Sequence, residues 1–165
     1  MDNYVCRVPS LEELIKKQDY EMEHSNDKEN WIIWKEKAIE RFKSGKVLVY
    51  YGFLGDEIVC ECTSAIDKSV VQNSEGLIDD ETAYLYAFRT VDKYQGKGYF
   101  SKLFKFMISD LKKRGYKRVT LGVEPEEKKN KAIYTKYGFT NYIKTSTEEY
   151  PDGTKIDVEY YAKYL

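Results

Sequence analysis

The chain has 165 residues, about the size of one domain with one hydrophobic core, so we expect a single domain over residues 1–165 and no second catalytic domain. Hydrophobic residues make up 42% and charged residues 33%, as in soluble globular proteins, and no apolar run reaches the ~18 residues that span a bilayer, so membrane insertion is not expected. The 27 basic and 28 acidic side chains nearly cancel, which argues against a strongly basic nucleic-acid-binding protein.

The hydrophobic pattern of the first half predicts a strand, two helices and a hairpin. Ser10 and Glu13 have the spacing of a capping box, which marks the start of the first helix, and Gly45 marks the end of the second. Residues 67–81 are polar and acidic and are expected to form a loop. The expected elements are a strand at Tyr4–Val8, helices at about 10–22 and 28–44, and strands at Lys46–Phe53 and Glu57–Ile66.

The second half alternates between strands and helices and ends in another hairpin. Apolar residues at i, i+3 and i+4 spacing predict a long helix that Gly115 ends, and Gly138 ends a shorter one. The last strand alternates cleanly between apolar and polar residues. The expected elements are strands at Thr82–Val91 and Lys117–Val123, helices at Phe100–Arg114 and Lys128–Tyr137, and strands at Phe139–Thr147 and Asp157–Leu165.

The N-terminus and the cysteines indicate where the protein resides. Residues 1–4 lack the basic stretch and apolar segment of a secretory signal. Cys6, Cys60 and Cys62 are an odd number without metal-ligand spacing, so neither a disulfide framework nor a metal site is expected. The prediction is a cytoplasmic protein.

Charge is distributed unevenly along the chain. Residues 1–92 hold 11 Lys and Arg against 19 Asp and Glu, whereas residues 93–165 hold 16 against 9. Summed fields of this kind favour a polyanionic ligand on the C-terminal half and a cationic one on the N-terminal half. Scattered, solvated surface charge is the simpler alternative.

The segment Val91–Ser101 leaves a predicted strand and opens a predicted helix, so it carries the clearest chemical signal. Gly96 and Gly98 let a phosphate approach the backbone, unpaired N–H groups at the helix start attract negative charge, and Lys97 adds a formal charge. An ordinary turn, in which the glycines only relieve crowding, is the alternative.

Two common phosphate-binding loops fit this segment poorly. A P-loop requires Gly-x-x-x-x-Gly-Lys-[Ser/Thr], which is absent. A dinucleotide fingerprint requires a third glycine where Ser101 stands, although Glu124 could supply its acidic residue. Because three strands and two helices precede the turn, a Rossmann-type site is disfavoured.

Two motifs resemble the GNAT N-acetyltransferase superfamily. Gln95-Gly96-Lys97-Gly98-Tyr99-Phe100 is similar to its signature [Gln/Arg]-x-x-Gly-x-[Gly/Ala], except that Phe100 replaces the final small residue. Tyr134-Thr135-Lys136-Tyr137-Gly138-Phe139 is similar to the family's Tyr-x-x-x-Gly-Phe, which ends a short helix. These motifs cover residues 82–139 with their connecting strand, and the rest of the chain agrees in element order.

The resemblance implies an α/β (α+β) GNAT-type acyl-CoA N-acyltransferase fold, with a mixed, mainly antiparallel central sheet flanked by about four helices. It also implies an enzyme, an acetyl-CoA-dependent N-acetyltransferase that uses no metal and moves the acetyl group to a primary amine by direct attack in a ternary complex. A non-catalytic acyl-CoA-binding or regulatory module is the alternative, because Phe100 and Glu127 depart from the family pattern.

Site residues follow from the same resemblance. Acetyl-CoA is expected where the fourth and fifth strands separate, with its pyrophosphate on the glycine turn and Lys93, Lys97, Lys102 and Lys105 nearby. Tyr134 matches the family's proton donor to the departing thiolate, although a core tyrosine is the simpler reading in a chain with 16 of them. Asn130 lies one turn before Tyr134 on the same face, and it could replace the asparagine that relatives have at the position of Glu127. The residues expected to bind the cofactor are Phe88, Arg89, Thr90, Gln95, Gly96, Lys97, Gly98, Tyr99, Phe100, Ser101 and Asn130.

The general base is not assigned by the sequence. Some relatives carry a glutamate late in the fifth strand, where this chain has Gly122. Glu57, Glu61, the acidic residues 79–81 or a chain of water molecules remain candidates. His24, the only histidine, is expected to be a solvated side chain on a turn.

The acceptor is expected over the two N-terminal helices. Glu21, Glu23, Asp27 and Glu29 make this region acidic, which suits a polyamine, an aminoglycoside, a lysine side chain or a protein N-terminus. Trp31, Trp34 and Phe42 lie at helical spacing and are expected in the core rather than in a pocket. The partner is therefore a small-molecule or peptide amine, with neither nucleic acid nor membrane, and a homodimer is compatible with this reading.

Overall fold

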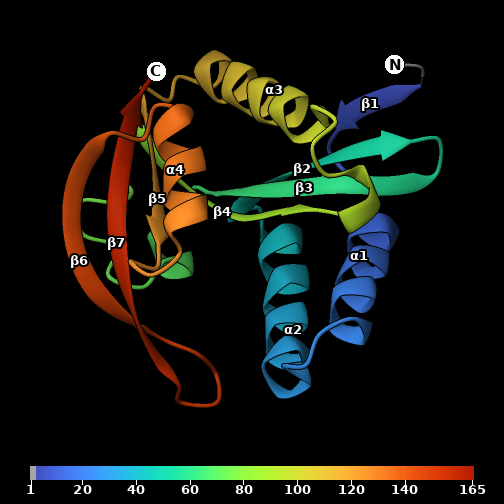
Figure 1. Cartoon of the computed structure of the whole chain (residues 1–165), viewed down its shortest axis with the longest axis horizontal. Helices are drawn as coiled ribbons and strands as arrows, with labels where there is room; N and C mark the ends of the chain where they lie inside the picture. The colour runs from blue at the N-terminus through green and yellow to red at the C-terminus, as the bar shows by residue number, and fades with distance from the viewer. Residues whose placement is uncertain (1–2) are drawn as a thin grey trace.

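The computed structural model describes residues 3–165, so Met1 and Asp2 of the N-terminal segment lie outside the described residues. One seven-stranded sheet has the strand order β1-β2-β3-β4-β5-β7-β6 (Figure 1). Only β4 and β5 run parallel, and every other neighbouring pair is antiparallel. The strands are β1 (Tyr4–Arg7), β2 (Val47–Leu54), β3 (Glu57–Ala65), β4 (Thr82–Thr90), β5 (Arg118–Val123), β6 (Asn141–Glu149) and β7 (Lys155–Tyr164).

Helices cover both faces of the sheet. Apolar side chains of α3 and α4 join the larger hydrophobic cluster on one face, whereas α1 and α2 pack on the other (Figure 1). The helices are α1 (Leu11–Glu23), α2 (Lys28–Ser44), α3 (Tyr99–Lys113) and α4 (Lys128–Lys136), with short 3₁₀ helices η1 (Lys68–Val70) and η2 (Asp92–Tyr94). The predicted fold class is confirmed.

Local sequence explains where the helices begin and end. The Ser10 hydroxyl accepts from the Glu13 N–H and the Glu13 carboxylate accepts from the Ser10 N–H, which completes the predicted capping box. Gly45 ends α2 in the left-handed conformation, with φ of 74°, where a residue with a side chain would be strained.

The prediction of the C-terminal hairpin was displaced by two residues. The strand expected from Phe139 begins only at Asn141, because the Phe139 N–H bonds back to the Tyr134 carbonyl and the ring is buried under the sheet. Gly138, with φ of 101°, makes this reversal possible. The first strand of the hairpin ends at Glu149, and the second begins at Lys155.

The central feature of the sheet is a gap between β4 and β5. The two strands pair only where Thr82–Tyr84 meets Arg118–Thr120, and beyond this point they diverge. The register between β3 and β4 shifts between Glu61 and Thr63, and Ala87 adopts a positive φ of 59°. A β-bulge of this kind bends a strand, so the second half of β4 turns away from β5 and leaves main-chain groups on that edge without a strand partner.

None of the helices in the described part of the chain is long and apolar enough to cross a membrane. Cys6, Cys60 and Cys62 are all free thiols.

Candidate active site

The glycine turn before α3 presents a row of free amides. Gly96 and Gly98 have φ values of 75° and 83°, and a Cβ atom built on either would meet only open space. The first bond of the helix runs from the Lys102 N–H to the Gly98 carbonyl at 3.2 Å. Among residues 3–165 no acceptor pairs with the N–H groups of residues 96–101. These donors, an open approach and a helix N-terminus together fit a bound phosphate.

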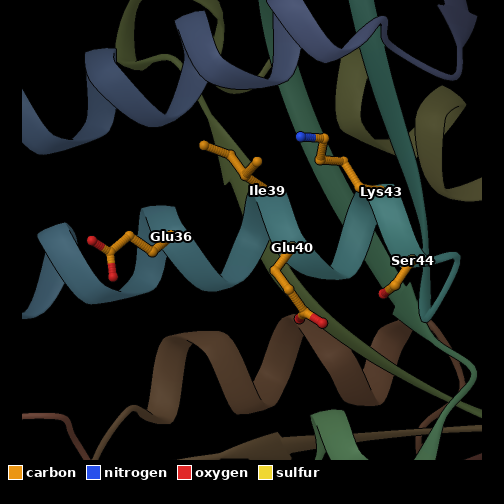
Figure 2. A pocket seen from close by; sticks show the side chains of 5 residues that line it. All are labelled: Glu36, Ile39, Glu40, Lys43 and Ser44. Atoms are coloured by element: carbon orange, nitrogen blue, oxygen red, sulfur yellow. The ribbon is translucent and has the colours of Figure 1, made fainter.

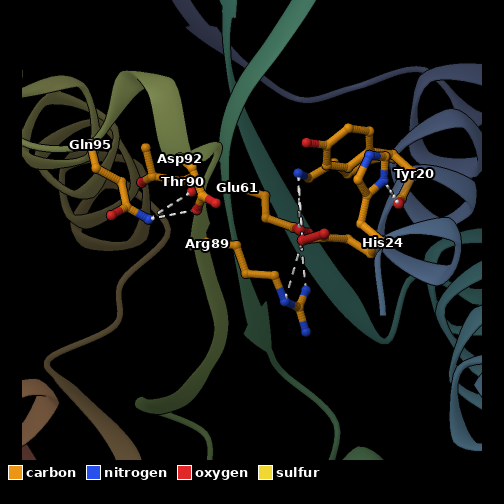
Figure 3. A network of polar contacts seen from close by, with 9 residues as sticks. Tyr20, His24, Glu61, Arg89, Thr90, Asp92 and Gln95 are labelled. Atoms are coloured by element: carbon orange, nitrogen blue, oxygen red, sulfur yellow. Dashed lines mark hydrogen bonds and ion pairs between the residues drawn. The ribbon is translucent and has the colours of Figure 1, made fainter. Parts of the chain in front are cut away.

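Side-chain hydrogen bonds stabilise this turn. Gln95 Nε2 donates to the Thr90 carbonyl at 3.2 Å and to Asp92 Oδ1 at 3.3 Å (Figure 3). The buried Tyr99 offers its carbonyl to the Tyr4 hydroxyl at 2.8 Å, which ties β1 to the first turn of α3. The turn is therefore fixed by contacts that leave its outward N–H groups unused.

The two lysines of this turn differ in their surroundings. Lys93 Nζ lies 3.2 Å from Glu57, which neutralises part of its charge. Lys97 is exposed and lies 5.9 Å from the centroid of the Tyr94 ring. Of the two, Lys97 is thus the better placed to meet a phosphate.

An aromatic cluster lies below the gap on the face covered by α3 and α4. The Phe88 ring is 5.3 Å from Phe100 and 5.6 Å from Tyr134, measured between centroids. Phe100, which replaces the small residue of the motif, turns its half-buried ring into this cluster and toward Tyr137. The substitution therefore fills the core, while the Phe100 N–H stays among the unpaired amides of the turn.

Tyr134 stands at the edge of this cluster with its hydroxyl unused. Among the described residues nothing accepts or donates a hydrogen bond to that hydroxyl. Burial, and secondarily the charge of Glu127, raise the pKa of Tyr134 above its ordinary value. The phenol therefore stays protonated near neutral pH and can donate its proton.

Asn130 is already engaged by a neighbour. Its Nδ2 donates to Glu127 Oε2 at 2.5 Å, across the first turn of α4. Glu127 stands where relatives have an asparagine, so this hydrogen bond links that position to Asn130.

Arg89 points to the opposite face, toward α1. Its Nη1 donates to Glu61 at 3.1 Å (Figure 3), and its Nε lies 3.8 Å from Glu21. The guanidinium carbon lies 4.9 Å from the centroid of the Trp31 ring. Lys17 Nζ is 3.9 Å from the same Glu61 carboxylate, which is 1% exposed. Burial raises the pKa of Glu61, and the two cations limit that rise. In the sheet Arg89 pairs with Glu61 of β3, and its side chain lies away from the glycine turn, although the cofactor was expected to bind it.

A cavity of about 740 Å³ lies on this second face, between the sheet, the two N-terminal helices and the β6–β7 hairpin. It reaches the gap through Ala87 and Gly122, and the buried Tyr51 hydroxyl that lines it has no hydrogen-bond partner in the part of the chain that the structure describes. Further lining residues include Gln18, Trp31, Trp34, Arg41, Glu61, Tyr84, Tyr86, Arg89, Glu148 and Tyr150. Trp31 and Trp34, which were expected in the core, line the cavity as well, whereas Phe42 packs with the core.

The hairpin closes this cavity by contacts to two other segments. Asn30 Oδ1 accepts from the Asp152 N–H at 3.0 Å, and the Trp34 and Tyr150 rings meet edge to face at 5.2 Å. On the other side, Gln72 exchanges two hydrogen bonds with the Glu149 main chain, at 3.0 and 2.9 Å. The β6–β7 hairpin therefore forms the roof of the cavity, and contacts hold it at both edges.

The candidate bases from the sequence occupy very different positions. Glu57 is bound by Tyr94 and Lys93 near the glycine turn, and Glu81 pairs with Lys117 at the opposite end of β4. His24 is exposed and stacked on Tyr20 (Figure 3). Of the candidates, only Glu61 lines the cavity.

Glu148 also lines the cavity, and the sequence alone did not indicate this. The strand was expected to end at Thr147, one residue before it. Alternate residues of β6 are half-buried, and Glu148 is in phase with Ser146, so the period of two was the available signal.

A second, shallower hollow lies over the C-terminal half of α2 (Figure 2). Its lining comes from that helix alone, with side chains that do not converge on one point. In the described part of the chain no three His, Cys, Asp or Glu side chains gather as they would around a metal ion.

Comparison with solved structures supports the architecture. A probable acetyltransferase from Staphylococcus epidermidis ATCC 12228 is 14% identical, with a TM-score of 0.71 over 98% of this chain and 99% of that one. An acetyltransferase from Salmonella typhimurium that modifies the N-terminal serine of ribosomal protein L7/L12 is 15% identical, with a TM-score of 0.70 over 100% and 96%. The ribosomal-protein-S18-alanine N-acetyltransferase from Escherichia coli is 17% identical, with a TM-score of 0.65 over 98% and 94%.

No curated protein sequence matches the chain significantly. Residues 8–139, which include the glycine turn, the β4–β5 gap and Tyr134, match the acetyltransferase (GNAT) family. Proteins of this family generally use acetyl-CoA as cosubstrate. The chain is therefore an acetyltransferase that belongs to the GNAT family.

Proposed function

We propose that this protein transfers an acetyl group from acetyl-CoA to a primary amine held in the 740 Å³ cavity, in a ternary complex. The observation that carries the proposal is the β4–β5 gap, which has the free Tyr134 hydroxyl on one side and the mouth of the cavity on the other. Acyl transfer of this kind needs an activated ester, a neutral amine and a proton for the leaving thiolate.

The cofactor half of the site is proposed to work largely through the main chain. The unpaired amides of residues 96–101 would hold the pyrophosphate, and Lys97 would add charge. The free edge of β4 at Phe88–Thr90 would pair with the amides of the pantetheine arm as an added strand does. Asn130 would contact the cofactor through its amide oxygen, since its nitrogen is bound to Glu127.

Acetyl-CoA supplies the activated acetyl group as a thioester. Tyr134 is proposed to donate its phenolic proton to the thiolate as the carbon–sulfur bond breaks. The raised pKa of Tyr134 keeps that proton available at neutral pH.

A small-molecule amine or a peptide amine fits the cavity, which combines aromatic walls with charged groups at its inner end. Two of the similar structures act on ribosomal proteins, which keeps a protein N-terminus among the acceptors to be tested. We also propose that residues 1–165 form one domain, because the single sheet draws on the chain from β1 to β7. Cytoplasmic location stays a prediction.

The proposal is tested by thiol release from acetyl-CoA with a panel of amines: a polyamine, an aminoglycoside, a lysine derivative and peptides with free N-termini. Release that requires one of these amines supports the transferase. Calorimetry on the same preparation compares binding of acetyl-CoA with binding of NAD, the ligand that a Rossmann-type site would prefer. Tight binding of acetyl-CoA without thiol release on any amine would favour the non-catalytic acyl-CoA-binding module, for which the departures at Phe100 and Glu127 are the argument.

A further inference from the structure

Glu148 is a carboxylate in the wall of the acceptor cavity that makes no ion pair. It lies on β6, and its Oε2 accepts a hydrogen bond of 2.5 Å from the Tyr160 hydroxyl of β7. In the part of the chain that the structure describes, no lysine, arginine or histidine nitrogen lies within ion-pair distance of it. A largely buried carboxylate without a cation is costly unless a ligand supplies one.

Two more glutamates line the cavity, the exposed Glu149 and the buried Glu61, and Glu61 differs from Glu148 in its ion pairs. Arg89 and Lys17 lie 3.1 and 3.9 Å from it, so its charge is already balanced. A bound ammonium group would find little net attraction there. Glu148 offers an unbalanced negative charge instead.

Glu148 is connected to β5 through Tyr160. Tyr160, which binds Glu148, pairs with Gly122 of β5 in the sheet. A Cβ atom at Gly122 would lie 2.6 Å from Val158 Cγ1 and 3.0 Å from the Tyr84 hydroxyl, so β5 itself has no room for an inward carboxylate here. Glu148 instead supplies a carboxylate to the cavity from the neighbouring hairpin.

Tyr84 of β4 lines the same cavity as Glu148, and its ring centroid lies 6.3 Å from that of Tyr160. Tyr134 packs instead against Phe88, in the aromatic cluster on the face covered by α3 and α4. Glu148 is thus on the acceptor side of the gap, and Tyr134 is on the cofactor side.

We propose that Glu148 is the general base of the reaction, binding the acceptor's ammonium group in the cavity and taking its proton. This inference rests on the proposed acetyl transfer. The nitrogen lone pair freed in this way forms the new bond to the acetyl carbon while the carbon–sulfur bond breaks. The nitrogen loses two protons in all: Glu148 passes one to solvent, and the other balances the proton that Tyr134 gives to sulfur and then regains.

Several charged or titratable groups face Glu148 and shape its titration. They are Tyr160 on β7, Tyr84 on β4, Tyr150 in the hairpin and Glu124 after β5, with Lys37 and Arg41 of α2 also lining the cavity. Burial raises the pKa of Glu148, and the hydrogen bond from Tyr160 opposes this rise. A base with a raised pKa accepts a proton more readily near neutral pH.

The test is Glu148→Gln, which keeps the shape of the side chain and an acceptor for Tyr160. With the best amine of the panel, kcat/KM at pH 7 should fall by roughly 10²- to 10⁴-fold. The loss should shrink as pH rises, because the variant depends on amine that is already neutral and that fraction grows with pH. Calorimetry should show unchanged affinity for acetyl-CoA and weaker affinity for the amine in the presence of coenzyme A.

Asp157→Asn is the matched control, since it removes an exposed carboxylate from the same hairpin. It should keep the wild-type rate and pH profile. If Glu148→Gln keeps them too while the wild type acetylates the amine, Glu148 is not the base and the proposed function stands. If the wild type binds acetyl-CoA but acetylates no amine, the proposed function fails and this inference fails with it.

Discussion

Tyr134 is the residue on which the proposed chemistry depends most. Its ring packs edge-on against Phe88, and its hydroxyl has no partner in the described part of the chain. Tyr134→Phe keeps the packing and removes only the proton donor. We expect kcat to fall by roughly 10²- to 10⁴-fold, with acetyl-CoA affinity and melting temperature nearly unchanged. Steady-state kinetics and calorimetry measure these quantities.

Tyr142→Phe is the control for this substitution, because Tyr142 is 58% exposed and its hydroxyl bonds, among residues 3–165, only to Thr145. It should leave kcat unchanged. Wild-type turnover by Tyr134→Phe, with chemistry shown to be rate-limiting, would remove Tyr134 from the mechanism.

Gly98 tests the phosphate turn. Gly98→Ala puts a methyl group into the open space before the turn and strains a backbone with φ of 83°. Gly45→Ala carries a similar strain at φ of 74°, also with open space around its Cβ, at the remote end of α2. We expect both variants to lose about 1 kcal/mol of stability. Only Gly98→Ala should lose roughly 1–3 kcal/mol of acetyl-CoA binding free energy, measured by calorimetry. Equal affinity in the two variants would exclude the turn as the pyrophosphate site.

The positions of single residues were predictable where local geometry fixes them. Gly96 and Gly98 lie on the expected strand-to-helix turn, and Tyr134 lies in the expected short helix before Gly138, while their roles stay predictions. The direction of the Arg89 side chain was not predictable, because the bulge at Ala87 resets which face each β4 residue presents. Glu148 was missed because its burial depends on a hairpin that folds over distant segments.

At the scale of elements, the start of α1 is predicted to respond to pH. The hydrogen bond from Arg7 lowers the pKa of Glu13 to about 2, against an ordinary value of 4.5. A lowered pKa stabilises the fold above the ordinary value, and that stabilisation is lost as pH falls from about 4.5 toward 2. Because both side chains are partly exposed, we expect Glu13→Gln to cost only about 1 kcal/mol at pH 7.

Denaturant unfolding at several pH values measures this effect. The stability difference between the wild type and Glu13→Gln should shrink as pH falls below about 4.5 and should be mostly gone at pH 2. A constant stability difference from pH 7 to pH 2 would contradict the role assigned to the Arg7–Glu13 pair.

The β6–β7 hairpin is predicted to support acceptor binding. Asn30 is 1% exposed and bridges Asp27 and Asp152, whose carboxylates solvent can reach, so Asn30→Ala removes these hydrogen bonds and should cost about 1 kcal/mol of stability. We expect KM for the amine to rise several-fold, with unchanged affinity for acetyl-CoA. A double-mutant cycle with Asp152→Ala should give a coupling energy of about 0.5 kcal/mol or more. Purely additive effects would show that these residues do not hold the hairpin.

Most elements were predictable because capping signals and periodicity are local. The capping box at Ser10 and the glycines at positions 45 and 138 act within a few residues of where they stand. The two-residue error at β6 arose because Phe139 continues a strand-like pattern, while tertiary burial and its bond to Tyr134 hold it outside the strand. Packing overrode propensity there.

At the scale of the whole molecule, the order of elements identified the architecture, and the matching family confirms it. The acceptor cavity was not predictable in the same way. Its roof joins Asn30 to Asp152, which are 122 residues apart in the sequence, and its floor comes from four strands. Two tryptophans at ordinary core spacing became cavity walls because the hairpin, rather than another helix, covers them.

The two sides of the gap together make the central claim, which is that acetyl-CoA and an amine react across it. The most direct measurement is the stoichiometry of products with the best amine acceptor, with free thiol followed by absorbance and the amine followed by mass spectrometry. We predict one acetylated amine for each thiol released, and both products reduced in parallel by Tyr134→Phe. Thiol released without acetylated amine, or neither product from an enzyme saturated with acetyl-CoA, would contradict the account.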